Sequence, residues 1–137
     1  MAAIAELRAR LEGLLSELSD VDIQRTPEGD YPFRWGSASC FVTLVDDDPA
    51  LVSVFGGMLS GVPRTDKLCS ALNDINAEIK FGRVFWVRDR VVVATEMVAD
   101  DLDGSELENA VTAIGRVADA YDTDLQSRFG GQLSFRS

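Results

Sequence analysis

The feature that most constrains the fold of this 137-residue chain is a repeated change in hydrophobic period. Apolar residues recur every three or four positions in three segments, as in helices, and about every second position in the two regions between them, as in strands. The resulting order is helix, three or four strands, helix, two strands, helix. Short connections between strands favour antiparallel pairing, so the sequence predicts an α+β domain with three helices packed on a mainly antiparallel sheet.

The three segments with helical period differ in how their ends are marked. Residues 3–18 are expected to form an amphipathic first helix that ends at Ser19 and Asp20, whereas Thr65 is the expected N-cap of the second helix. Asp103 and Glu106 form a capping box for the third helix, which should run to Gly130. The apolar stripes are Ile4, Leu7, Leu11, Leu14, Leu15 and Leu18; Leu68, Leu72, Ile75 and Ile79; and Leu107, Val111, Ile114, Ala118, Tyr121 and Leu125.

The two regions between the helices carry the signals of strands and turns. Aromatic and β-branched residues with turn residues between them predict strands over 31–35, 38–45, 50–55, 81–87 and 91–98, with residues 21–25 a candidate for one more. The acidic run Asp46–Asp48 with Pro49 turns the chain after 45, and Arg88–Arg90 suits a tight hairpin. After Gly56 and Gly57 the chain should leave the sheet.

Composition excludes several classes of partner. The length fits one domain, residues 1–137, which should fold without a cofactor. A formal net charge of −10 repels phosphate backbones and anionic lipids, so nucleic acid and membrane partners are disfavoured. Charges interrupt the apolar residues at the N-terminus, and no run approaches the roughly 18 apolar residues of a membrane span. We therefore expect a cytoplasmic protein.

The sequence offers little catalytic chemistry. Histidine is absent, and no CxxC pair or glycine-rich phosphate loop occurs. Asp46–Asp48 could ligate Ca²⁺ or Mg²⁺, but the run lacks the spacing of a calcium loop and is better explained as a solvated turn. Cys40 has no neighbouring histidine to activate it, so Cys40 and Cys69 are expected to be buried, unpaired thiols. An enzyme is disfavoured.

The aromatic residues are more informative, and they allow two interpretations. Aromatic side chains on strands usually form a core. On 81–87, however, Phe81, Arg83 and Phe85 alternate with Val84 and Trp86, so both faces of the sheet carry bulky apolar groups. One layer of helices cannot easily cover both faces, and the excess predicts an oligomer interface or a binding groove.

Three stretches together resemble a known family: residues 29–42 (GDYPFRWGSASCFV), 72–87 (LNDINAEIKFGRVFWV) and 122–131 (DTDLQSRFGG). The chain resembles the YbjN-like proteins of actinobacteria, which are similar in fold to the small chaperones of type III secretion systems. The matching positions are Leu72, Asn73, Asn76, Phe81, Gly82, Phe85 and Trp86. The resemblance implies a non-enzymatic homodimer that holds an extended or partly unfolded peptide segment.

These observations predict two surfaces. Peptide binding is expected to use the widened stripe of the first helix and aromatic residues of the strands, namely Leu14, Leu15, Phe33, Trp35 and Phe41. Trp35 could equally be a core residue. The dimer interface is expected on the second helix and the neighbouring hairpin, at Leu72, Asn73, Ile75 and Trp86. The alternative function is a regulatory or scaffold protein that binds a folded partner through the same surface.

Overall fold

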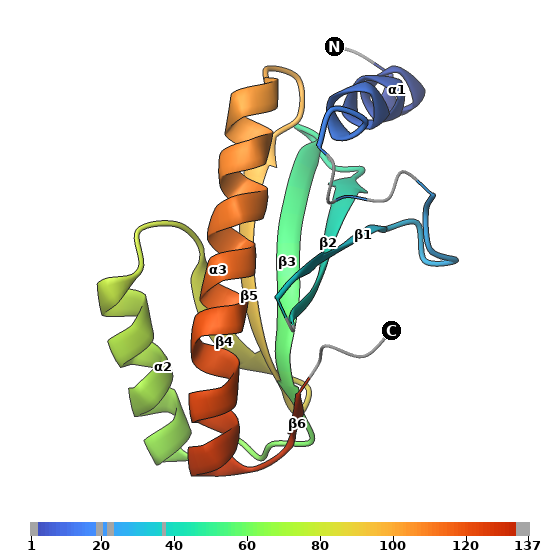
Figure 1. Cartoon of the computed structure of the whole chain (residues 1–137). Coiled ribbons are helices and arrows are strands. Elements are labelled where there is room, and N and C mark those ends of the chain that lie inside the picture. Colours follow the sequence, from blue (N-terminus) through green and yellow to red (C-terminus); the bar gives the residue numbers. More distant parts are fainter. Residues whose placement is uncertain (1–2, 19–20, 22–23, 37, 134–137) are drawn as a thin grey trace.

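The computed structural model describes residues 3–18, 21, 24–36 and 38–133 as one antiparallel sheet with three helices (Figure 1). The strands are β1 (Tyr31–Trp35), β2 (Ala38–Val45), β3 (Leu51–Ser60), β4 (Arg83–Val87), β5 (Arg90–Val98) and β6 (Gln132–Leu133). The helices are α1 (Ile4–Leu15), α2 (Asp66–Glu78) and α3 (Gly104–Phe129). This arrangement confirms the predicted α+β class.

The strand order is β1-β2-β3-β5-β4, and the short β6 pairs with the end of β3. Every pairing between these strands is antiparallel. The long helix α3 crosses the sheet, α2 lies beside β4, and α1 lies across one end of the domain (Figure 1). The core therefore fills the space between one face of the sheet and the helices.

The predicted helix caps are confirmed. The Thr65 hydroxyl accepts a hydrogen bond from the backbone N–H of Leu68 at 3.1 Å, which satisfies one of the unpaired donors of the first turn of α2. At the start of α3 the Asp103 carboxylate accepts from the Glu106 N–H at 2.8 Å, and the Glu106 carboxylate accepts from the Asp103 N–H at 3.1 Å. This reciprocal pair fixes where α3 begins.

The sheet differs from the sequence prediction at the end of β3, where the strand continues through Gly56 and Gly57 to Ser60 instead of ending at Phe55. A side chain at Gly56 would approach the Cys40 sulfur to 2.9 Å, so glycine here permits close packing. Beyond Gly57 a bulge shifts the register with β5. The glycines therefore accommodate packing and a bulge rather than ending the strand.

Two smaller elements also differ from the prediction. Of the candidate strand 21–25, Val21 makes an isolated antiparallel bridge to Phe33, and residues 22 and 23 lie outside the described part of the chain. The strand β6 was not predicted. It becomes possible because Gly131, with a φ of +81°, brings its backbone so close to Ser60 that a Cβ would lie 2.6 Å from the Ser60 carbonyl oxygen.

Candidate binding surface

The two faces of the sheet differ in how well they are covered. Along β2, the residues Ala38, Cys40, Val42 and Leu44 are buried, while the residues between them are only partly buried. A Cβ at Gly56, which pairs with Cys40, would lie 3.5 Å from the side chain of Ala118 on α3. The buried face is therefore the one beneath α3. We call it the sealed face, and its opposite the open face.

The residues of the open face follow from the strand register. Phe41, Phe55, Ala94 and Arg83 are paired across β2, β3, β5 and β4, and the neighbouring row pairs Ser39, Gly57, Val92 and Phe85. A polar row of Thr43, Ser53 and Glu96 follows on the other side of the Phe41 row, and beyond it a last row pairs Val45, Leu51 and Val98. Since side chains two positions apart share a face, these rows form one surface.

Apolar groups dominate the open face. Phe41 and Phe55 stack with their ring centroids 5.4 Å apart, and the Arg83 guanidinium lies 5.2 Å from the centroid of the Phe85 ring. Phe41, Phe55 and Phe85 are each partly exposed, and Val98 is 46% exposed. Aromatic rings that retain exposed area on a flat surface are typical anchors for a partner.

One ion pair crosses this apolar surface. The two terminal guanidinium nitrogens of Arg83 donate to Glu96, Nη1 to Oε1 at 2.8 Å and Nη2 to Oε2 at 3.2 Å. The bidentate geometry holds the Arg83 side chain over Phe85 and leaves it partly exposed. The centre of the open face thus carries a fixed polar group among its aromatic rings.

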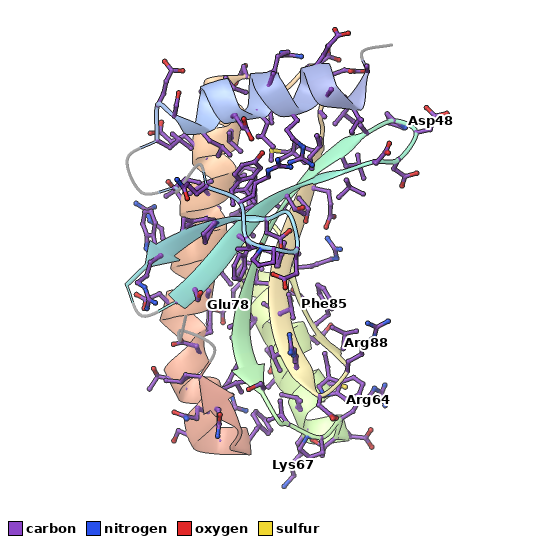
Figure 2. The ribbon with its side chains drawn as sticks, turned by 90° about the vertical axis from the view of Figure 1, so that its right-hand side faces the viewer. Asp48, Arg64, Lys67, Glu78, Phe85 and Arg88 are labelled. Atoms are coloured by element: carbon purple, nitrogen blue, oxygen red, sulfur yellow. The ribbon has the colours of Figure 1, made fainter. Side chains whose placement is uncertain are left out.

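None of the three helices in the described residues lies over the open face. The helix α3 packs against β1, β2, β3, β5 and β6 from the sealed side, and α2 contacts β4. In Figure 2, which views the molecule from the side, Phe85 lies on the side of the sheet away from α3. Partly exposed apolar patches, such as the one around Phe41, Phe55 and Phe85, are typical of interaction sites.

The edge formed by β4 is partly blocked by a side chain. The Asn76 amide on α2 donates to the carbonyl of Val84 at 3.0 Å and accepts from its N–H at 2.8 Å. The amide therefore occupies the hydrogen-bonding groups that an added strand would use. At the opposite edge, Pro32 of β1 has no N–H to offer. Both edges are thus less available to an extended peptide than the open face.

The structure does not bring the five predicted peptide-binding residues onto one surface. Phe41 lies on the open face. Phe33 is 4% exposed on the sealed face, and Trp35, on the same side, packs so closely on α3 that a Cβ at Gly115 would lie 2.6 Å from its Cβ. Leu15 is fully buried in the core, and Leu14 is partly buried against it.

The four residues of the predicted dimer interface are also separated. Leu72 and Ile75 lie on the buried side of α2 and belong to the core, whereas Asn73 is exposed. Trp86 is partly buried, and its indole N–H donates to the Val62 carbonyl at 2.8 Å. Of these four residues, Asn73 alone is exposed.

Sequence reasoning missed most of the open face, including Phe55, Val92 and Val98. For Val92 and Val98 the signal was present in the alternation of bulky residues on both sides of 81–98, whereas Phe55 lies on β3, outside that segment. What the sequence could not give is the order β2-β3-β5-β4, which places Phe41 beside Phe55 and both in line with Arg83.

The titratable groups of the core have structural roles. Burial, together with the carboxylates of Asp119 and Asp122, raises the pKa of Cys40 to about 12, so this thiol holds its proton and is a poor nucleophile. The Tyr31 hydroxyl donates to Glu12 at 2.6 Å and accepts from Arg8 at 3.0 Å, which ties α1 to β1. Burial and the Glu12 hydrogen bond raise the pKa of Tyr31.

Within residues 3–18, 21, 24–36 and 38–133, no group of three histidine, cysteine, aspartate or glutamate side chains is placed to hold a metal ion. Among the helices of the same residues, none combines the length and apolar character that crossing a bilayer requires.

Comparisons with known proteins agree with this geometry. A crystal structure of an uncharacterized protein from Methanothermobacter thermautotrophicus is similar to this chain, with a TM-score of 0.65, over 90% of this chain and 99% of the other. At 12% sequence identity this similarity shows a shared fold. Residues 5–137 match the family described as "T3SS (YopN, CesT) and YbjN peptide-binding chaperone 1". Because the match spans nearly the whole chain, this protein belongs to that family of peptide-binding chaperones.

Proposed function

We propose that this chain is a non-enzymatic, chaperone-like module that holds an extended segment of a client protein against its open face. The observation that carries the proposal is the apolar patch formed by Phe41, Phe55, Phe85 and their neighbours, on a face that no helix of the described residues covers. Membership in a family of peptide-binding chaperones supports a binding role. The mechanism is physical: apolar side chains of the client are transferred from water onto these rings.

The open face supports this role better than the sheet edges do. Binding at an edge requires a row of free backbone groups, and Asn76 occupies those of Val84. Phe41 is the one predicted residue that belongs to the proposed site. Leu14 and Trp35 are partly exposed but lie off the open face, so we propose them only as contacts for parts of the client that reach beyond that face, while Leu15 and Phe33 belong to the core.

A binding measurement with matched variants tests this proposal. Fluorescently labelled extended peptides with an alternating apolar centre should bind the wild-type protein, and Phe55→Ala should weaken binding by about tenfold or more, as expected for an interface anchor. Phe129→Ala is the control, because it makes the same change to a partly buried phenylalanine at the end of α3. Equal loss in both variants would count against the open face.

The same variants separate the two kinds of partner. A chaperone should retain many unstructured peptides, and each should depend on Phe55. A regulatory or scaffold protein should instead retain one folded partner and bind none of the isolated peptides. The second result would replace the chaperone-like role with the alternative function.

We also propose that the protein is cytoplasmic and forms a homodimer through the outer side of α2, where Asn73 is exposed. We also propose, from the three sequence stretches, that the chain is related to the YbjN-like proteins of actinobacteria. Sedimentation at micromolar concentration should give twice the monomer mass of 14.9 kDa. A monomer at high concentration would remove the dimer without affecting the peptide-binding proposal.

A further inference from the structure

The open face ends in opposite charges, beginning with an acidic end. Asp46, Asp47 and Asp48 form the turn between β2 and β3, and Asp100 and Asp101 follow β5. The two segments adjoin, since the N–H of Ala99 donates to the carbonyl of Ala50 at 2.9 Å. The guanidinium of Arg10 also lies here, where it donates to the carbonyls of Asp100 and Leu102. Carboxylates therefore outnumber cations at this end.

The other end of the strands is basic. Arg88 and Arg90 belong to the hairpin between β4 and β5, and Arg64 and Lys67 belong to the segment that leads into α2. These two segments are joined by a hydrogen bond from the N–H of Val62 to the carbonyl of Asp89 at 3.1 Å. All four cationic side chains are exposed, and the nearby carboxylates are those of Asp66 and Asp89. Cations therefore outnumber carboxylates here.

The two ends lie far enough apart to act independently. The strand β3 has 10 residues, which span about 33 Å at the usual rise of a strand. The screening length at physiological ionic strength is about 8 Å, so neither end feels the other strongly. Figure 2 shows Asp48 at one end, Arg64 and Arg88 at the other, and Phe85 between them.

We infer that the open face selects an extended segment of about ten residues whose apolar centre is flanked by basic residues on one side and acidic residues on the other. This inference rests on the proposed function and names its ligand class. The basic flank lies against Asp46–Asp48 and the acidic flank against Arg64 and Arg88. These charge contacts determine which segments are preferred, while the apolar rows between the two ends supply most of the binding affinity.

The net charge alone would give a different selectivity. A protein of net charge −10 attracts any cationic peptide, so it would favour basic residues on both flanks. The local arrangement favours one basic and one acidic flank instead, since contacts at each end dominate once salt screens the long-range field. The two explanations therefore rank the same peptides differently.

Three labelled peptides with one shared apolar centre test the inference at physiological salt. Their flanks are lysine and glutamate, lysine on both sides, or glutamate on both sides. The lysine–glutamate peptide should bind most tightly, by about fivefold over the all-lysine peptide, as expected for a few exposed charge pairs. Reversing the order of the two flanks should change little, because an extended chain can lie on the face in either direction.

A charge-reversal variant sharpens the test. In Arg64→Glu/Arg88→Glu both ends of the open face become acidic, so the preference should change to the all-lysine peptide. An unchanged ranking in this variant, or an all-lysine preference in the wild type, would overturn the inference while leaving peptide binding intact. Failure of all three peptides and of an uncharged one would instead remove the proposed function.

The same measurements also test whether a second copy of the chain, rather than a client peptide, occupies the open face. Two open faces placed antiparallel would also match acidic to basic ends. A dimer that dissociates on Phe55→Asp, and that the lysine–glutamate peptide fails to displace, would assign the face to self-association and overturn the inference. Dissociation of that dimer by the peptide would support it.

Discussion

The sealed and open faces of this sheet are built from the same alternating strands, yet they differ in what completes them. On the sealed face, α3 and α2 bury each aliphatic residue beneath them, and Gly115 lets the Trp35 ring rest on the α3 backbone. On the open face, Phe41 stacks on Phe55 and Arg83 lies over Phe85, and no helix in the described part of the chain covers them. The alternation of residues thus shows that a strand has two apolar sides, but the side on which the helices pack becomes the core.

The largest difference between the faces should appear when one large side chain is removed from each. Ile114→Ala deletes a fully buried side chain of α3, which should lower the free energy of unfolding by about 2–5 kcal/mol. Phe85→Ala on the open face should cost only about 1 kcal/mol, because Phe85 is partly exposed already. Urea denaturation measures both. Equal losses would mean that the open face contributes to the core.

A second comparison uses two helical glycines. Gly115→Ala places a methyl group within 2.6 Å of Trp35 on the sealed side, so it should destabilise the fold by about 1–3 kcal/mol. Gly13→Ala on α1 is the matched control, since no atom lies within 4 Å of its added methyl group. That change should stabilise the protein by about 0.5–1 kcal/mol through helix propensity. A neutral Gly115→Ala would show that Trp35 can move away from α3.

The smallest effect concerns Cys40 and appears only in alkali. Its pKa is raised from 9.0 to about 12 in the folded protein, so the unfolded chain loses this proton first as the pH rises. The contribution of Cys40 to stability is therefore complete below pH 9 and is lost between pH 9 and 12, by up to about 1.4 kcal/mol per pH unit.

Cys40→Ala should make the decline in stability above pH 9 shallower than in the wild type, measured by urea denaturation at several pH values. Tyr31 and Tyr121, whose pKa values are also raised, titrate in both proteins, so the difference between the two slopes isolates Cys40. Identical slopes would indicate that the thiol is less deeply enclosed by the sealed face.

The features that could be predicted from the sequence are those that depend on residues close together in the chain. The caps at Thr65 and Asp103 and the Arg88–Asp89 turn depend on residues a few positions apart, and each was predicted. The extension of β3 through Gly56 depends on Cys40, which lies on another strand, so it could not be seen locally. Trp35 was ambiguous for the same reason, because its environment is created by Gly115, eighty residues later.

The position of the candidate site was not predicted. The bulky residues on both sides of 81–98 led us to expect an oligomer interface or a binding groove, which stays a prediction, and the structure places Phe85, Val92 and Val98 on the open face. Leu14 and Phe41 were expected on one surface. In the structure, α1 carries Leu14 at the end of the domain, whereas Phe41 faces away from the helices. Pairing between distant strands determines such positions, and one sequence carries no direct record of it.

The amide of Asn76 has a consequence for what the protein can safely hold. A segment rich in alternating apolar residues is prone to form cross-β fibrils, and an unpaired strand edge can act as the template on which such a fibril starts. With Asn76 bonded to Val84 at one edge and Pro32 at the other, a segment lying flat on the open face finds little template to grow from. Under the proposed function, these blocked edges would let the protein hold an aggregation-prone chain without acting as its nucleus.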